Sequence, residues 1–209
     1  IDEQHRFGVH QRLSLAAKGD AVDTLVMTAT PIPRTLMLTA YGDMDTSRLM
    51  EKPPGRKPVD TRVLPVERLE QIVDACSRAL NAGDKVFWVC PLIEESEKLD
   101  VAAAEDRQAA LASRFGNRVG LVHGRMKGPE KDKAMAAFVD GNVDILVATT
   151  VIEVGVDVPA ATVMVIEHSE RFGLAQLHQL RGRIGRSEKP ATCLLMYGSP
   201  LTETARSRL

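Results

Sequence analysis

The chain has 209 residues, of which 44% are hydrophobic and 26% charged, and its net charge at neutral pH is −1. This composition is typical of a soluble globular protein with a sizeable core. The balanced charge excludes a strongly basic overall field, so any nucleic-acid surface must be a local basic patch. No apolar run approaches the roughly 18 residues of a membrane span, and no signal-peptide pattern is present, which predicts a cytoplasmic protein without a membrane partner.

Residues 1–50 have room for about two strand–helix units. The stretch 23–33 (DTLVMTATPIP) predicts a strand that ends in a polar loop, and 33–42 (PRTLMLTAYG) predicts a short helix. Two such units cannot bury the faces of their own strands. We therefore interpret residues 1–50 as the C-terminal remnant of a first domain. The next residues, 51–60 (EKPPGRKPVD), combine three prolines and a glycine with charge, which predicts a linker.

After the linker, apolar runs alternate with amphipathic stretches, which predicts an α/β domain over 61–200. The apolar runs are continuous, as in strands buried on both faces, and this favours a parallel sheet with helices on both faces and right-handed crossovers. Predicted strands lie at 61–66, 85–93, 119–124, 143–150, 162–169 and 192–198. Predicted helices lie at 67–82, 101–116, 128–141 and 173–185.

The cysteines are widely separated in the sequence and form no CxxC pair; they are Cys76, Cys90 and Cys193. Structural zinc sites and disulfide frameworks use closer and more numerous cysteines. We therefore expect three reduced cysteines in the core, as in a protein of a reducing compartment.

An acidic pair opens the chain, with Asp2 and Glu3 directly behind an apolar residue and His5 two positions later. Magnesium prefers carboxylate oxygens, so one acid can hold the ion while its neighbour orients an attacking water. The alternative is an exposed acidic turn with a surface histidine. Two acids alone do not decide between these interpretations.

The stretch 27–35 (MTATPIPRT) places Thr28 and Thr30 at a predicted strand end. Their hydroxyls can bond the backbone or a neighbouring loop. The alternative is a helix-capping loop, in which Thr30 is the cap and Pro33 the first helical residue. Both interpretations can hold at once.

A second polar loop follows the predicted strand 143–150, with hydroxyls at Thr149 and Thr150. Hydroxyls and backbone N–H groups at a strand end are common contacts for phosphate oxygens. Gly155 permits close approach of the backbone, and Asp157 can accept a hydrogen bond from a ribose hydroxyl. The alternative is a turn whose valines fill the core.

The most informative stretch is 176–186 (QLHQLRGRIGR), in which Arg181, Arg183 and Arg186 crowd one helix end with two glycines. Like charges so close repel one another, and glycine lowers helix stability by about 1 kcal/mol relative to alanine. An anionic partner explains both features, because the planar guanidinium suits phosphate. The alternatives are a solvated basic face and an RNA-binding patch.

A basic loop lies between the predicted strand 119–124 and the helix after it, with His123, Arg125 and Lys127. Together with backbone N–H groups at the helix start, these cations can hold a nucleic-acid phosphate. The alternative is an ordinary charged loop.

Taken together and in this order, these stretches resemble the superfamily-two helicases, and in particular the bacterial helicases that remodel stalled replication forks. The resemblance implies a RecA-like C-terminal helicase domain that follows the tail of a first RecA-like domain, with residues 201–209 beginning a helical hairpin. The stretches that carry it are 2–8, 27–35, 53–59, 89–100, 123–127, 148–159 and 173–186.

The resemblance implies ATP and Mg²⁺ as cofactors. Asp2 would hold the metal of MgATP, Glu3 would position the hydrolytic water and His5 would couple this site to the second domain. Arg183 and Arg186 would be arginine fingers that reach the γ-phosphate.

Further residues gain roles from the same resemblance. Gln179 would support the arginine fingers, and Gly155 and Asp157 would approach the nucleotide. The residues implied to contact the DNA backbone, or to couple it to the nucleotide, are Thr28, Thr30, Arg125, Thr149 and Thr150.

The implied activity is ATP-driven translocation on double-stranded DNA, with branch migration and regression of stalled forks in DNA repair and recombination. Branched DNA and the missing N-terminal wedge and P-loop domains of the same protein would be the partners. The phosphate-binding patterns GxxxxGKS and GxxxxGKT do not occur in the sequence, so we expect the chain to be inactive alone. The alternatives are the translocase module of a transcription-repair coupling factor and a non-catalytic DNA-binding or docking module.

Overall fold

The computed structural model describes residues 55–91, 97–149 and 158–208, together with scattered positions before residue 52. The chain divides into two compact units, residues 1–51 and 52–209. In the strand predicted at 23–33, residues 23–25 and 27 are described and are not in a strand; the rest of that stretch and the helix predicted at 33–42 lie outside the described residues. The interpretation of residues 1–50 as the remnant of a first domain stays a prediction.

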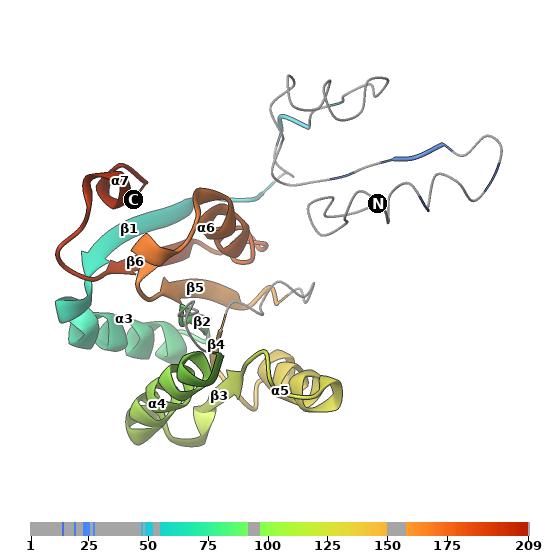
Figure 1. Ribbon diagram of the computed structural model, residues 1–209. Helices are drawn as coiled ribbons and strands as arrows, with labels where there is room; N and C mark the ends of the chain where they lie inside the picture. Colours follow the sequence, from blue (N-terminus) through green and yellow to red (C-terminus); the bar gives the residue numbers. More distant parts are fainter. Residues whose placement is uncertain are drawn as a thin grey trace. The chain divides into compact units, whose positions relative to one another are not determined.

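The second unit is built on a six-stranded sheet with the order β1-β6-β5-β2-β4-β3 (Figure 1). Every paired strand runs parallel to its neighbour, which confirms the predicted parallel sheet. The strands are β1 (Val59–Pro65), β2 (Lys85–Val89), β3 (Val119–Val122), β4 (Ile145–Ala148), β5 (Ala161–Ile166) and β6 (Ala191–Tyr197).

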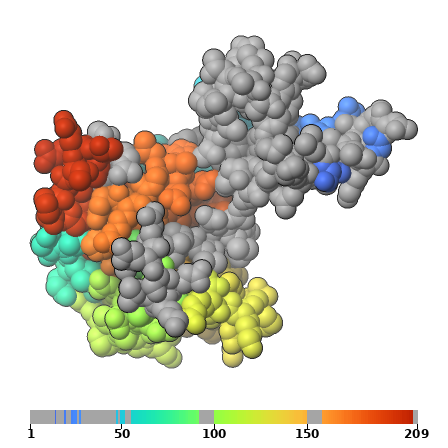
Figure 2. Space-filling view, viewed as in Figure 1, coloured from blue at the N-terminus to red at the C-terminus, as the bar shows by residue number. Residues whose placement is uncertain are grey.

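Helices cover both faces of this sheet and bury two hydrophobic clusters against it (Figure 1). Figure 2 shows in the same view that side chains fill the space between the ribbons of the second unit. One cluster joins α3 and α4 to the sheet, and the other joins α5 and α6 to its opposite face. The α-helices are α3 (Leu69–Asn81), α4 (Glu97–Phe115), α5 (Gly128–Asp140), α6 (Leu174–Arg181) and α7 (Glu203–Arg208).

Helix α3 illustrates how the sequence specifies the packing. Its apolar residues recur at the helical period, and Ile72, Val73, Cys76 and Leu80 are all buried against the sheet. Because side chains three and four positions apart share one helix face, a single stripe covers the strands while the opposite face remains polar. The predicted amphipathic helix is confirmed.

Several predicted elements end earlier than expected, and two of them have a clear backbone cause. The predicted strand 162–169 stops at Ile166, because His168 adopts a left-handed backbone conformation with φ of 47° that interrupts the extended chain. The predicted helix 173–185 stops at Arg181, and Gly185 has φ of +68°, which a right-handed helix cannot contain. The arginines therefore lie at and just beyond the helix end.

The three cysteines are free and buried, which confirms the prediction of reduced core residues. Burial is the main cause that raises the pKa of Cys76, Cys90 and Cys193 to about 12. For Cys90, the nearby carboxylate of Glu167 raises the pKa further while Arg107 opposes it.

Within the described ranges, no helix is long and apolar enough to cross a membrane.

We expect all three thiols to resist alkylation in the folded chain between pH 7 and pH 9. Their pKa of about 12 keeps the thiolate rare in this range, and burial blocks the reagent. Mass spectrometry after iodoacetamide treatment should find three modified cysteines only once denaturant is added. Rapid labelling of any one of them in the native chain would contradict the buried environment.

Candidate functional site

Polar side chains gather where β3 and β4 end at the carboxyl edge of the sheet. Val122 at the end of β3 pairs with Ala148 at the end of β4. The residues that follow them, His123 and Thr149, therefore lie side by side just beyond the two strands. The Thr149 N–H donates to the Val122 carbonyl at 3.3 Å. The atoms His123 Nδ1 and Thr149 Oγ1 are buried, with no hydrogen-bond partner among the residues that the structure describes. Such atoms are costly to leave unsatisfied, which favours a polar ligand or loop at this edge.

The loop after β3 has a backbone held by local hydrogen bonds. The Lys131 ammonium donates to the Gly124 carbonyl at 2.8 Å, and the Lys127 N–H donates to the Glu130 carboxylate at 3.0 Å. Arg125 lies between these contacts and is exposed. The loop therefore presents one guanidinium to solvent from a fixed backbone, beside the edge that carries Thr149.

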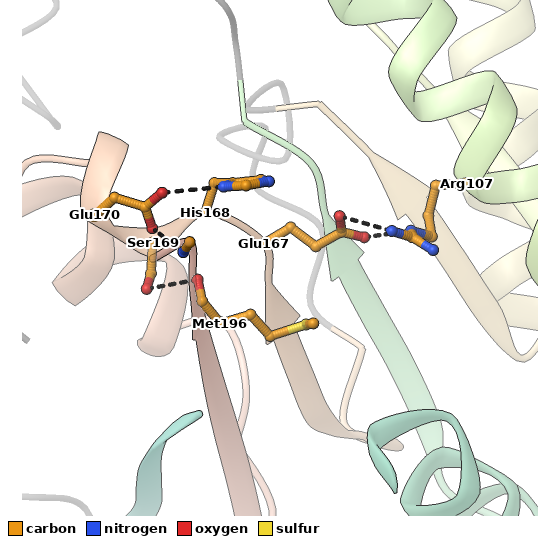
Figure 3. A network of polar contacts seen from close by, with 7 residues as sticks. Arg107, Glu167, His168, Ser169, Glu170 and Met196 are labelled. Atoms are coloured by element: carbon orange, nitrogen blue, oxygen red, sulfur yellow. Dashed lines mark hydrogen bonds and ion pairs between the residues drawn. The ribbon is translucent and has the colours of Figure 1, made fainter. Parts of the chain in front are cut away.

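An ion pair with a buried carboxylate lies where β5 ends, and no local sequence pattern predicts this pairing because its residues are 60 positions apart (Figure 3). Glu167 is 7% exposed and accepts hydrogen bonds from the Trp88 indole and from Arg107 Nε, the latter at 2.5 Å. A second bond joins Arg107 Nη2 to the other carboxylate oxygen at 3.1 Å. The pair ties α4 to the carboxyl end of β5. The one sequence signal is an acid directly after an apolar strand.

The next three residues fix the entrance to α6 against the end of β6 (Figure 3). The Ser169 hydroxyl donates to the Met196 carbonyl at 2.9 Å. The Glu170 carboxylate accepts from the Gly198 N–H at 3.3 Å and lies 3.0 Å from His168 Nδ1. The start of α6 is therefore anchored at the carboxyl edge of the sheet.

At its other end, α6 leads into residues 181–186, which we call the arginine loop. Ile184 is completely buried in the core cluster on this face of the sheet. The Arg183 N–H donates to the Leu180 carbonyl at 2.9 Å, and Arg186 Nε donates to the Gly182 carbonyl at 3.3 Å. Apolar burial and backbone bonds thus hold a loop that carries three guanidinium groups.

The described site residues form two groups at opposite edges of the sheet. Arg125 and Thr149 follow β3 and β4 at the carboxyl edge. The arginine loop precedes β6 and therefore lies at the amino edge, with Arg183 and Arg186 in it. Gln179 is half-buried on α6, one turn before Arg183.

The other predicted site residues fall outside the described residues: Asp2, Glu3, His5, Thr28, Thr30, Thr150, Gly155 and Asp157. The predicted metal position at Asp2 is among them. In the part of the chain that the structure describes, no group of three His, Cys, Asp or Glu side chains could hold a metal ion. The donors that it does supply are guanidinium and hydroxyl groups, which fit phosphate oxygens.

A family model described as the helicase conserved C-terminal domain matches residues 66–188. The chain therefore belongs to the helicase C-terminal domain family, and its RecA-like fold is the one that the motifs predicted. The match contains Arg125, Thr149, Gln179, Arg183 and Arg186.

Within this family the chain is similar to the bacterial ATP-dependent DNA helicase RecG, as the order of its motifs indicated. It is 57% identical to RecG of Acidithiobacillus ferridurans and 55% identical to RecG of Escherichia coli, over the whole chain and 31% of each relative. It is 52% identical to RecG of Thermotoga maritima, over 27% of that protein. The chain thus spans about a third of the length of these relatives.

Solved structures show the same similarity. A structure of RecG bound to a three-way DNA junction matches with a TM-score of 0.78 and 46% identity, over the whole chain and 26% of that protein. A structure of S. cerevisiae Dbp5 bound to RNA and ADP BeF3 matches with a TM-score of 0.67 over 95% of the chain and 50% of that protein. At 14% identity, the second match shows the fold alone.

Replacing Arg107 with methionine should lower the free energy of unfolding by about 3 kcal/mol, because it leaves the buried Glu167 carboxylate without its charged partner. Arg114→Met is the matched control on the same helix, where the arginine is 41% exposed and faces Asp74. The control should cost less than about 1 kcal/mol. Urea denaturation of both variants measures the difference, and equal small losses would refute a stabilising role for the ion pair.

Proposed function

We propose that this chain is the C-terminal part of the motor core of an ATP-dependent double-stranded DNA helicase of the RecG type. The whole protein would translocate on DNA, drive branch migration and regress stalled replication forks. The observation that carries the proposal is the arginine loop: three guanidinium groups on a backbone fixed by the buried Ile184, in a chain that matches RecG along its whole length. A loop shaped only for solubility would not need that anchoring.

The nucleotide part of the proposal divides the work between two lobes. Residues 1–50 would belong to the first lobe, in which Asp2 binds Mg²⁺, Glu3 orients water and His5 couples the lobes. ATP would supply the phosphoanhydride bond whose hydrolysis drives movement. Arg183 and Arg186 would offset the charge that develops on the γ-phosphate, while Gly155 and Asp157 approach the nucleotide and Gln179 supports the arginines.

The size of the arginine contribution can be bounded. An arginine finger contributes on the order of 10³ to 10⁵ in rate, or about 4 to 7 kcal/mol of transition-state stabilisation. A flexible side chain on a mobile loop would lose much of this to misplacement, because only positioned donors avoid reorganisation during the reaction. The fixed backbone of the arginine loop supplies that positioning.

The DNA part of the proposal uses the opposite edge of the sheet. The exposed guanidinium of Arg125 would contact a phosphate, and the buried Thr149 hydroxyl would find its missing hydrogen bond with the DNA backbone or an adjoining loop. Thr150 would contact the DNA backbone beside Thr149, and Thr28 and Thr30 would relay between DNA and nucleotide. The similarity to a RecG structure that holds a three-way junction supports branched duplex DNA as the partner.

The remaining length of the protein would supply the missing parts. Because the relatives are about three times as long as the chain, a P-loop and a wedge domain would lie elsewhere in the same protein. Residues 51–60 would link the lobes and residues 61–200 form the second lobe. Residues 201–209, with α7, would begin the helical hairpin. The 52% to 57% identity to RecG supports this choice over a transcription-repair coupling factor.

In the full-length protein, Arg186→Ala should lower the turnover number of DNA-stimulated ATP hydrolysis by about 10³-fold or more, because it removes a guanidinium from the transition state. ATP affinity, measured by equilibrium binding of a fluorescent analogue, should change little. Arg62→Ala is the control, since Arg62 lies on β1, where its side chain is 67% exposed. An undiminished turnover number in the Arg186→Ala variant would show that Arg186 is not an arginine finger.

The chain by itself should release no phosphate from ATP, with or without branched DNA, because it contains neither GxxxxGKS nor GxxxxGKT. A coupled phosphate-release assay on the purified chain measures this, with the full-length protein as the positive control. DNA-stimulated release from the isolated chain would contradict the division of the site between two lobes.

A further inference from the structure

The segment that leads into β1 is bonded to the arginine loop. Arg56 is half-buried, and its Nε donates to the carbonyl oxygen of Gly185 at 3.0 Å, although 129 positions separate the two residues. A bond between a charged donor and a carbonyl is stronger than a neutral one, because the positive charge of the guanidinium attracts the carbonyl dipole more strongly. This bond reaches the backbone between Arg183 and Arg186.

The surrounding backbone is packed too closely for the contact to be incidental. A Cβ at Gly185, where φ is +68°, would lie 3.0 Å from Val59 Cγ2 and 3.3 Å from the Ala191 Cβ. A Cβ at Gly55 would lie 2.9 Å from a carboxylate oxygen of Glu188. Residues 55–59 therefore run in direct contact with the stretch that joins the arginine loop to β6.

We propose that Arg56 is a positioning residue that holds the arginine loop in place for its action on the nucleotide; this inference rests on the proposed function. The bond fixes the peptide plane of Gly185, and the backbone on either side of that plane carries Arg183 and Arg186. Ile184 anchors the loop to the core from within. Arg56 anchors it from the segment that leads into β1, near the start of the second unit.

The geometry distinguishes this role from general stabilisation. Arg56 binds one carbonyl in one loop, whereas β1 is already joined to β6 along seven paired positions, Val59 to Pro65. Removing the arginine should therefore leave the sheet paired and loosen the arginine loop alone. A guanidinium that only stabilised the edge of the sheet would affect all of these parts together.

The test uses Arg56→Ala, Arg56→Lys and the control Arg62→Ala. Arg62 lies on β1, where its side chain is 67% exposed and bonded to Asp60 at 2.8 Å. The first readout is hydrogen exchange in the chain itself, at the amides of Arg183 and Ile184, which donate to Leu180 and Arg181. Loss of the Arg56 bond should speed exchange there by about tenfold or more, with exchange in β6 unchanged.

The second readout is catalysis by the full-length protein. Arg56→Ala should lower the turnover number of DNA-stimulated ATP hydrolysis by about tenfold to a hundredfold, because misplaced guanidinium groups stabilise the transition state less. The KM for ATP should stay the same. Arg56→Lys should recover part of the loss, because an ammonium can reach the carbonyl without the planar geometry. Arg62→Ala should match the unchanged protein in both readouts.

The two readouts separate the failure of this inference from the failure of the proposed function. If the unchanged full-length protein hydrolyses no ATP, the proposed function is wrong, and the exchange data alone decide whether Arg56 holds the loop. If ATP is hydrolysed but Arg56→Ala changes neither exchange nor turnover, the positioning role is refuted. Faster exchange throughout residues 59–65 and 191–197 would refute it as well, because it would show a purely structural role.

Discussion

All six strands of the second unit are parallel, and the placement of the described candidate site residues follows from this one constraint. Each loop that leaves a strand must lie at the carboxyl edge of the sheet, and each loop that enters a strand must lie at the amino edge. Arg125 and Thr149 belong to the first kind of loop, and the arginine loop to the second. The topology alone thus places Arg125 and Thr149, which we propose for DNA, at the opposite edge of the sheet from the arginine loop, which we propose for the nucleotide.

The position of Arg181, Arg183 and Arg186 in the fold offsets the repulsion between their positive charges. The arginine loop continues from the C-terminal end of α6, and carbonyl groups at such an end carry partial negative charge that favours nearby cations. The bond from Arg186 to the Gly182 carbonyl uses one of these groups directly. Burial of Ile184 then offsets the entropy lost by ordering the loop. A concentration of positive charge can therefore be kept on a well-defined backbone before any anion binds.

Sequence patterns predicted the helices and strands well, but they did not predict the contacts between these elements. The stripe of Ile72, Val73, Cys76 and Leu80 marks α3, and unbroken apolar runs mark the buried strands, because both signals are local. The same reasoning overextended α6, since Ile184 continues the spacing of Leu177 and Leu180 although it reaches the core from a loop. The Arg107–Glu167 and Arg56–Gly185 contacts join residues 60 and 129 positions apart. The spacing of apolar residues along the sequence cannot predict contacts between residues so far apart.

One short helix, α6, joins the arginine loop to the carboxyl edge of the sheet. The start of α6 is held to the end of β6 by the Ser169–Met196 bond, and its last residue, Arg181, opens the arginine loop. Helix α6 has only 8 residues, so it is a short connection between the Ser169–Met196 bond and the arginine loop. Two parts of the fold therefore hold the arginine loop. Helix α6 holds it from the carboxyl edge, and Arg56 holds it from the segment before β1. In the function proposed above, contacts from two directions would let the arginine loop respond both to DNA and to nucleotide.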